Sequence, residues 1–435
     1  MQVRFIRIFG FFLLAALVAG CAVNPATGRR ELAVLKVSTE QEIAIGAKTF
    51  PQVVQQMGGE YPDPRLQEYV QQIGARLGKL SHRPDLPYNF RVVNDSAPNA
   101  FALPGGFIGI SRGLLVHMEN EAQLASVLGH EIGHVTARHS VQALQRGALL
   151  NLALAVVGGA TGDSVYGTAA RQTSQLAAQL MENSYSREQE LESDRLGIDY
   201  MVAARYDPQG SVQVMDFFRR ELEGGSGGGR LSGLFRTHPF SADRMRDNTE
   251  YILANHAGIL NHPDYPLRPE PFLAATARLR ESRQGYELYE EARRLEAQGN
   301  LPKAVATYLM AATAAPDESL ILAGLGMAYL KADDLGAARR HLGRSVQLQG
   351  EYHLSRLGLG YALAQLGENQ RAVAELEKAM ALLPTLQGAF VLAETYEKVG
   401  ERQKALELYR SVAQADPQGR LGKASAERVR VLAGP

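Results

Sequence analysis

The 435-residue sequence has one cysteine, no tryptophan, no excess of either charge and no apolar run long enough to span a bilayer. Because a single cysteine has no partner within the chain, an intramolecular disulfide is excluded. The 46 lysines and arginines are balanced by 46 aspartates and glutamates without a basic stripe, which argues against nucleic-acid binding. We interpret the short apolar stretch over residues 148–160 as a buried helix or, alternatively, as a flap beside lipid.

The N-terminus is typical of an exported protein. Arg4 and Arg7 precede an apolar run over residues 9–18, which is followed by Val-Ala-Gly and then by Cys21. This segment resembles a bacterial lipoprotein signal, which implies cleavage before Cys21 and lipid on its sulfur. The alternative is an ordinary secretory signal with an incidental thiol. Because Ala22 stands where enterobacterial-type sorting uses aspartate to retain lipoproteins at the inner membrane, we expect the periplasmic side of the outer membrane.

The most informative stretch is His130-Glu131-Ile132-Gly133-His134. Residues four apart lie on one face of a helix, so His130 and His134 can bind one metal ion while Glu131 reaches a water molecule beside it. A helix is predicted here because apolar residues recur at three- and four-residue intervals, at Leu124, Val127, Leu128, Ile132 and Val135, after the polar start Asn120-Glu121. The alternative is a pair of ordinary core histidines.

A catalytic zinc site of this kind needs a third protein ligand, often a glutamate on a later helix. Spacing alone does not choose between Glu188, Glu190 and Glu192. The motif HExxH followed by ExxxD resembles the M48 metallopeptidases, and the resemblance implies Glu190 as the ligand and Asp194 as its neighbour that hydrogen-bonds a ligand imidazole. The alternative is a solvated, charged helix face.

Thr237-His238-Pro239, followed by Arg244, resembles a segment that M48 enzymes place over the metal. The resemblance implies that His238 caps the open coordination position or steadies the reaction intermediate; otherwise the His-Pro pair is a loop turn. Arg244 is expected to be either an electrostatic partner of the substrate or a charge on a helix surface. The glycine-rich run at 224–229 is typical of a flexible linker, so this segment could move as a lid.

Two strand-like pieces flank Pro104-Gly105-Gly106, which predicts a hairpin, and residues 88–94 alternate like a third strand. An edge strand beside the active helix could pair with an extended substrate, or the strands could simply cover the core. In the mechanism that these residues support, Glu131 takes a proton from water that a zinc ion has acidified and passes it to the leaving amine. His139 is expected to be structural or to support the metal ligands.

The C-terminal third is repetitive. Alanines are separated by 34, 34 and 33 residues, and each is followed twelve positions later by proline or glycine, as at Ala304, Ala338, Ala372, Ala405 and at Pro316, Gly350, Pro384, Pro417. Small residues stand twelve positions before each alanine, where paired helices must approach closely, at Ala292, Gly326, Gly360 and Ala393. This is the tetratricopeptide pattern. We favour protein or peptide binding by the repeats over a role as a spacer.

The predicted fold class is mainly α, with an α+β zincin-like metallopeptidase domain that contains a small sheet, followed by an α-solenoid of tetratricopeptide repeats. The prolines between residues 256 and 272 mark the boundary between them. The expected division is a signal peptide at 1–20, a lipid-anchored tether at 21–37, a peptidase domain at 38–260, a linker at 261–283, four repeats at 284–417, and a capping helix with the C-terminus at 418–435.

The whole pattern resembles repeat-bearing M48 peptidases of Gram-negative envelopes. The resemblance implies a zinc endopeptidase, with one Zn²⁺ per chain, that degrades misassembled outer-membrane proteins and assists their assembly through its repeats. Its implied partners are protein or peptide substrates, outer-membrane assembly machinery and, through the lipid, a membrane surface. Such relatives can be free in the periplasm, whereas the N-terminus of this chain resembles a lipoprotein signal. A rival hypothesis is a binding scaffold whose zinc site is closed by His238.

Overall fold

The computed structural model of the protein describes residues 21–24, 26–28, 30–32, 37–145, 168–223 and 237–434. The expected signal peptide, the apolar stretch at 148–160 and the glycine-rich run at 224–229 lie outside the described residues. Cys21 is the first residue of strand β1 (Cys21–Val23). This strand pairs antiparallel with β2 (Arg30–Leu32). None of the helices described combines the length and the apolar character needed to cross a membrane.

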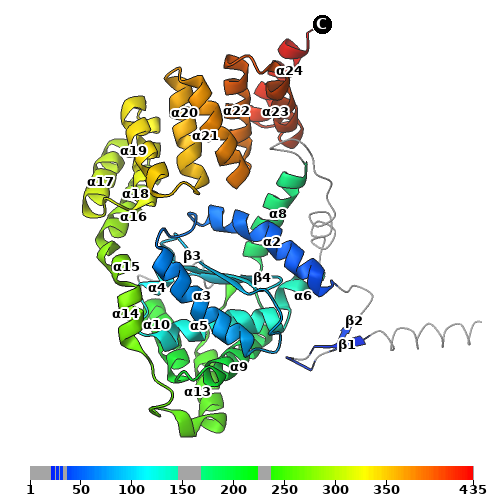
Figure 1. Ribbon diagram of the computed structural model, residues 1–435, viewed down its shortest axis with the longest axis vertical. Coiled ribbons are helices and arrows are strands. Elements are labelled where there is room, and N and C mark those ends of the chain that lie inside the picture. Colours follow the sequence, from blue (N-terminus) through cyan, green and yellow to red (C-terminus); the bar gives the residue numbers. More distant parts are fainter. Residues whose placement is uncertain are drawn as a thin grey trace, which may run out of the picture.

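A three-stranded sheet forms the centre of the N-terminal part (Figure 1), and its strands are β3 (Asn89–Val93), β4 (Ala100–Leu103) and β5 (Phe107–Ser111). β5 is the middle strand, parallel to β3 and antiparallel to β4. The predicted hairpin between β4 and β5 is confirmed. Its turn needs glycine because Gly105 and Gly106 have φ angles of +82° and +93°. β4 is therefore an edge strand, as the proposal of substrate pairing requires.

Helices cover this sheet. Those that precede the active helix are α2 (Thr39–Gln56), α3 (Pro64–Lys79) and the short α4 (Arg112–Leu115). The active helix α5 (Glu121–Thr136) begins at Asn120, whose side chain accepts a hydrogen bond from the Gln123 amide, as the polar start predicted. The helices that follow it are α6 (His139–Gln145), α8 (Thr168–Glu182), α9 (Arg187–Ala203), α10 (Gln209–Glu223) and α13 (Ala242–Asn255).

A short connection leads from α13 to the repeats through the 3-10 helix η2 (Ala257–Ile259), α14 (Pro269–Ala275) and α15 (Ala277–Glu281). The paired helices are then α16 (Arg283–Ala297) with α17 (Leu301–Ala314), α18 (Ser319–Lys331) with α19 (Leu335–Leu348), α20 (His353–Gln365) with α21 (Asn369–Leu382), and α22 (Leu386–Lys398) with α23 (Arg402–Ala415). The last described helix is α24 (Arg420–Ala433), as predicted for the cap. Figure 1 shows the pairs stacked in one row, which confirms the expected solenoid.

The packing of the repeats follows the sequence pattern. The four alanines spaced by 33 or 34 residues are completely buried. A methyl group added at Gly326 would lie 2.5 Å from Leu342, and one added at Gly360 would lie 2.6 Å from Leu376, so the small residues stand where helices meet. Each pair thus buries its apolar face against its neighbour. The domain boundaries proposed from the sequence remain predictions.

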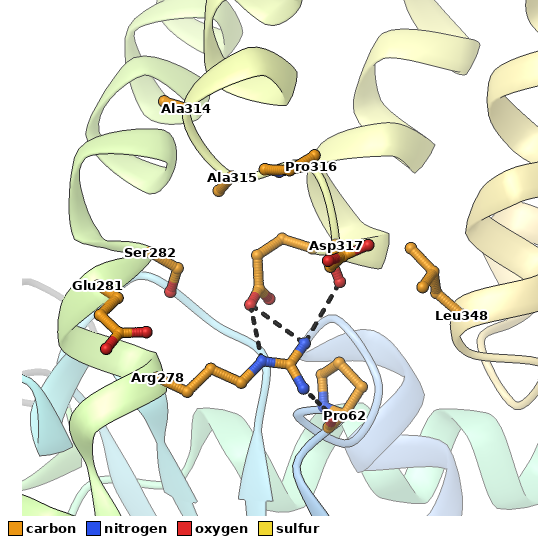
Figure 2. A pocket seen from close by; sticks show the side chains of 10 residues that line it. Pro62, Arg278, Glu281, Ser282, Ala314, Ala315, Pro316, Asp317 and Leu348 are labelled. Carbon is orange, nitrogen blue, oxygen red and sulfur yellow. Dashed lines mark hydrogen bonds and ion pairs between the residues drawn. The ribbon is translucent and has the colours of Figure 1, made fainter.

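The repeats are joined to the peptidase part by a polar seam, whose centre we call the junction cluster: Tyr61, Arg278, Tyr286 and Glu318. Both carboxylate oxygens of the buried Glu318 accept hydrogen bonds, one from the Tyr286 hydroxyl at 2.7 Å and the other from Tyr61 and Arg278, each at 3.3 Å. Figure 2 shows Arg278 reaching across a cavity of about 590 Å³ toward the carbonyl oxygen of Pro62, at 2.9 Å. The first two repeats are thereby fixed to the loop after α2.

Candidate active site

Two helices bring the predicted site residues together at an unusually close crossing. A methyl group on Gly129 or Gly133 of α5 would lie 2.9 Å or 2.8 Å from a carbonyl oxygen of α9, at Gly197 and Ser193 respectively. Since real Cβ atoms do not approach that closely, only glycine allows the two backbones to meet here. The crossing places the histidines of α5 opposite the acidic residues of α9.

Four side chains, which we call the metal cluster, converge at this crossing: His130, His134, Glu190 and His238. One ligand atom from each lies within 4.8 Å of all the others. The Nε2 atoms of His130 and His134 are 3.0 Å apart, and the Glu190 carboxylate oxygens lie 3.3 Å from His134 Nε2 and 3.6 Å from His130 Nε2. Of the three glutamates that spacing left open, Glu190 is therefore the one that faces both rings.

These separations fit a tetrahedral ion. Ligands at zinc distances of about 2.0–2.1 Å stand roughly 3.3–3.4 Å apart at the corners of a tetrahedron. The His130 ring uses its other nitrogen, Nδ1, against Asp194 at 2.8 Å, and His134 uses its Nδ1 against His139 at 2.9 Å. Both Nε2 atoms therefore present lone pairs to each other, an arrangement that a cation between them stabilises. The residues fit a divalent metal of the zinc type.

Asp194 and Arg244 support the cluster from one side. Arg244 donates from Nε and Nη2 to the two oxygens of Asp194, at 2.9 Å and 2.8 Å, and its Nη1 lies 2.5 Å from Glu190. Arg244 as a residue is 4% exposed, so the interpretation of Arg244 as a surface charge is wrong. Burial opposes protonation of Arg244, but the Asp194 and Glu190 carboxylates raise its pKa. Its role toward a substrate stays a prediction, because its donors are engaged within the protein.

Tyr185 and His139 support His134 from the other side; support of the ligands was one of the two roles expected for His139, whereas Tyr185 was not predicted. The Tyr185 ring stacks on the His134 ring with centroids 3.8 Å apart. His139 is completely buried and lies outside the metal cluster, as expected. Burial lowers the pKa of His134 well below its usual value, which keeps the ring neutral and available as a ligand. The motif spacing carries no signal for Tyr185, since it precedes α9 in a loop.

Glu131 points into the site without a complete set of partners. Its Oε2 atom is buried and finds no hydrogen-bond donor in the part of the chain that the structure describes. Burial raises the pKa of Glu131, against the effect of the nearby His238 and His130. A buried carboxylate with one open oxygen is suited to accept a proton from a water molecule. Besides the spacing of the ligand atoms, this unsatisfied oxygen of Glu131 also fits a catalytic metal site.

His238 reaches the cluster from the segment before α13. Its Nδ1 lies 3.0 Å from Glu190 Oε1 and 3.4 Å from His130 Nε2, and its Nε2 lies 3.6 Å from Glu131. The position of Pro239 is also fixed, because its carbonyl oxygen accepts a hydrogen bond from Arg244 at 2.9 Å. Burial opposes protonation of His238, but the carboxylates of Glu190 and Glu131 raise its pKa.

A small cavity adjoins the cluster and includes His130, Glu131, His238 and Arg244 in its wall. The remainder of the wall is mainly apolar, and it includes Ala100 of the edge strand together with Leu114, Val127, Val214, Met215 and Phe218. Backbone of β4 and apolar side chains thus lie beside the polar groups. With a volume of about 40 Å³, the cavity has space for a small group, such as a water molecule or a methyl group, next to the predicted base.

The sequence matches the model of Peptidase family M48 over residues 64–252. It is 32% identical over 193 residues to a putative beta-barrel assembly-enhancing protease of Vibrio cholerae, covering 43% of this chain and 39% of that protein. It is 28% identical over 267 residues to the mitochondrial metalloendopeptidase OMA1 of Schizosaccharomyces pombe, covering 57% and 72%. The chain spans about two fifths of the length of the beta-barrel assembly-enhancing proteases that it matches.

Among solved structures, the crystal structure of MamA is similar over 33% of this chain and 87% of its own, with 23% identity and a TM-score of 0.29. YrrB, a TPR protein with an unusual peptide-binding site, is similar over 36% and 81%, with 20% identity and a TM-score of 0.30.

Proposed function

Because residues 64–252 of the chain form a metallopeptidase domain of family M48, we propose that the protein is a zinc-dependent endopeptidase of a Gram-negative envelope. One observation carries the proposal: two imidazole lone pairs and a carboxylate converge beside a buried carboxylate oxygen that has no donor within the described chain. His130, His134 and Glu190 would hold the ion, and Glu131 would act as the base. Zinc is preferred because the donors are nitrogen and carboxylate oxygen at tetrahedral spacing.

A zinc ion bound here supplies polarisation of the scissile carbonyl and acidification of a water molecule. Glu131 accepts the proton of the attacking water on Oε2 and returns it to the nitrogen of the leaving amine. Burial raises the pKa of Glu131, which favours uptake of a proton by this carboxylate. Asp194 orients His130, and Arg244 keeps the charge of Asp194 compensated.

His238 Nδ1 lies 3.4 Å from His130 Nε2 and 3.0 Å from Glu190 Oε1, which supports the hypothesis that it would cap a bound metal. In that state a water molecule can enter only when the His238 segment moves away, and the hydrogen bond from Arg244 to Pro239 opposes the movement. Replacement of His238 by Ala should then raise basal cleavage. If His238 instead steadies the intermediate, the same variant should lose activity.

We propose that the substrates are unfolded segments of outer-membrane proteins. The proposal is supported by relatives from Vibrio cholerae and Escherichia coli whose printed names are putative beta-barrel assembly-enhancing protease and beta-barrel assembly-enhancing protease. The edge strand β4 would hold the substrate backbone by strand pairing. The repeats would bind the client or the assembly machinery. We further propose a lipid on Cys21 and a position on the periplasmic side of the outer membrane.

The test compares wild type with Glu131→Gln on an outer-membrane barrel protein presented both unfolded and folded. Loss of the base should lower the cleavage rate of the unfolded client by about 10²–10⁴-fold. Glu119→Gln is the matched control, since Glu119 is an exposed glutamate just before the same helix. Equal cleavage by wild type and Glu131→Gln, with zinc bound to both, would refute the enzyme hypothesis.

A second candidate function is a non-proteolytic scaffold, and the approach of His238 to the predicted ligand His130, at 3.4 Å, favours it. The scaffold hypothesis expects client assembly in cells to be unaffected by Glu131→Gln and by His238→Ala alike. The peptidase hypothesis expects stalled client to accumulate in cells with Glu131→Gln. Mass spectrometry of Cys21 from isolated envelopes tests the anchor independently of either function.

A further inference from the structure

We infer that His139 and Glu192 form a positioning pair that holds the metal ligand His134 in the orientation and tautomer required for metal binding. The inference rests on the proposed role of His134 as a ligand. His139 lies five residues after His134 in sequence, at the first position of α6, and Glu192 lies on α9. His139 lies outside the HExxH motif, and Glu192 occupies a position of ExxxD that the motif leaves unspecified.

The two ring nitrogens of His134 point in different directions. Nε2 lies 3.0 Å from His130 Nε2 and 3.3 Å from Glu190 Oε1, so it is the atom that faces the metal cluster. Nδ1 points away from the cluster and lies 2.9 Å from Nδ1 of His139. On the far side of the His139 ring, Nε2 lies 3.0 Å from Glu192 Oε2. The three side chains therefore form one continuous line from the metal cluster to a carboxylate.

These contacts indicate which ring nitrogens of His134 and His139 carry hydrogen. A metal ligand needs its lone pair on Nε2, so the hydrogen of a neutral His134 is on Nδ1 and is donated to His139. His139 then accepts at Nδ1 and carries its own hydrogen at Nε2, where Glu192 accepts it. With both rings neutral, this is the arrangement that gives each of the two short contacts one hydrogen. Ser193 Oγ, at 3.4 Å from His139 Nδ1, is a more distant second donor to the same atom.

Packing and hydrogen bonding restrain the orientation of the His134 ring. His134 and His139 are completely buried, and the Glu192 side chain is 18% exposed. Stacking on Tyr185 restrains the face of the His134 ring, and the hydrogen bond to His139 restrains its rotation about the Cβ–Cγ bond. Hydrogen-bond partners of this kind fix the tautomer of metal-ligating histidines, and their loss typically costs about 10–100-fold in metal affinity.

The two histidine ligands are thus supported by different means. His130 Nδ1 lies 2.8 Å from the Asp194 carboxylate with no residue between them, whereas an imidazole separates His134 from the Glu192 carboxylate. His139 is therefore a positioning residue that acts through His134. Its contribution depends on an acceptor at Nδ1 and a donor at Nε2.

The test is the zinc affinity of the full chain, measured by competition with a chromophoric chelator, together with the visible spectrum of the cobalt-substituted protein. His139→Phe keeps a ring but removes both polar atoms, and it should weaken zinc binding by about 10–100-fold and shift the cobalt bands. His139→Gln should stay within about threefold of wild type, because its amide can accept from His134 and donate to Glu192. His353→Phe is the matched control in the repeats and should leave zinc binding unchanged.

Zinc affinity of His139→Phe equal to that of wild type would overturn the inference, and so would an equal loss in His139→Gln, which would point to ring packing alone. If His139→Phe does not fold, Glu192→Leu provides the same test at a partly exposed position, where a several-fold loss supports the pair and an unchanged affinity refutes it. Wild type that binds no zinc would refute the proposed function itself. Wild type that binds zinc with no effect of His139 or Glu192 would refute only the pair.

Discussion

The metal cluster and the junction cluster are both buried groups of polar side chains, but they differ in how their hydrogen bonds close. In the junction cluster, both oxygens of Glu318 accept from tyrosine hydroxyls or from Arg278. In the metal cluster, lone pairs of His130 and His134 face each other at 3.0 Å, and Glu131 keeps one oxygen without a donor within the described residues. Hydrogen bonds alone complete the first cluster, whereas the second needs a cation and a water molecule.

The comparison distinguishes polar groups that stabilise the fold from polar groups that are arranged to bind a ligand. A carboxylate that is satisfied by protein donors contributes stability and has no capacity left for a ligand. A cluster of acceptors that converge without hydrogens is costly until an ion enters, so it marks a place where the fold has been shaped for a ligand. Substitutions in the junction cluster should therefore change only the stability of the protein. The properties of the metal cluster should instead depend on whether metal is bound.

The largest expected difference between the clusters is their response to chelation. Removal of zinc should abolish peptidase activity, and it should lower the free energy of unfolding by about 2.7 kcal/mol relative to protein at a free zinc concentration of about 100 times Kd. Scanning calorimetry with and without chelator measures the stability change. Glu318→Ala should show the same zinc-dependent difference as wild type, because the junction cluster does not contact the ion. Unfolding temperatures that do not depend on zinc would contradict the contrast.

Zinc removal has the largest effect on activity, whereas the largest effect on stability is expected from loss of the cation that already belongs to the metal site, Arg244. Arg244→Met leaves the buried charges of Asp194 and Glu190 without their partner and should destabilise the protein by about 3–5 kcal/mol. Arg246→Met, on the same helix but with a 60% exposed side chain, should change stability by less than about 0.5 kcal/mol. Chemical unfolding of the two variants measures the difference. Similar stabilities would mean that Arg244 is not needed to compensate these carboxylates.

At the junction a smaller change is expected. Glu318→Ala removes the acceptor of Tyr61 and one of the two acceptors of Tyr286, whose hydroxyl also lies 3.0 Å from Asn94 Oδ1, and it should cost about 1–3 kcal/mol, with cleavage of a short peptide unchanged. Asp317→Asn is the control, since its side chain is 71% exposed and pairs only at the surface with Arg344. A large loss of peptide cleavage in Glu318→Ala at a temperature where it is folded would show that the junction contributes to catalysis.

The smallest expected effects lie within the repeats and have opposite signs. A methyl group at Gly326 would lie 2.5 Å from Leu342, so Gly326→Ala should destabilise by about 1–3 kcal/mol. Gly343 is also helical but nothing lies within 4 Å of an added methyl group, so Gly343→Ala should stabilise by about 0.5–1 kcal/mol. Thermal unfolding of both variants checks the signs, and neither should alter zinc binding. Destabilisation by both substitutions would contradict the proposed packing.

The sequence predicted what depends on local periodicity. The four-residue spacing of His130 and His134 and the 33- or 34-residue spacing of the alanines each follow from regular helix geometry. Spacing did not distinguish Glu190 from Glu192, because both lie on one helix and only its packing against α5 decides which neighbour each side chain meets. In the structure Glu190 faces the metal cluster and Glu192 faces His139.

Contacts between distant segments were not predictable in this way. Charged residues are usually exposed, so the burial of Arg244 against Asp194 could not be inferred from the composition of α13. The stacking of Tyr185 on His134 and the junction cluster likewise depend on how remote elements pack. The sequence indicates which helices exist, and tertiary packing determines which of their side chains meet.

The most direct test of the account is a crystal structure of the purified chain with zinc located by anomalous scattering at the zinc edge. We expect one zinc ion per chain within bonding distance of His130 Nε2, His134 Nε2 and Glu190. A chain that crystallises from zinc-containing buffer with no ion at this position, or with the ion bound elsewhere, would contradict the claim that these three residues form a catalytic metal site.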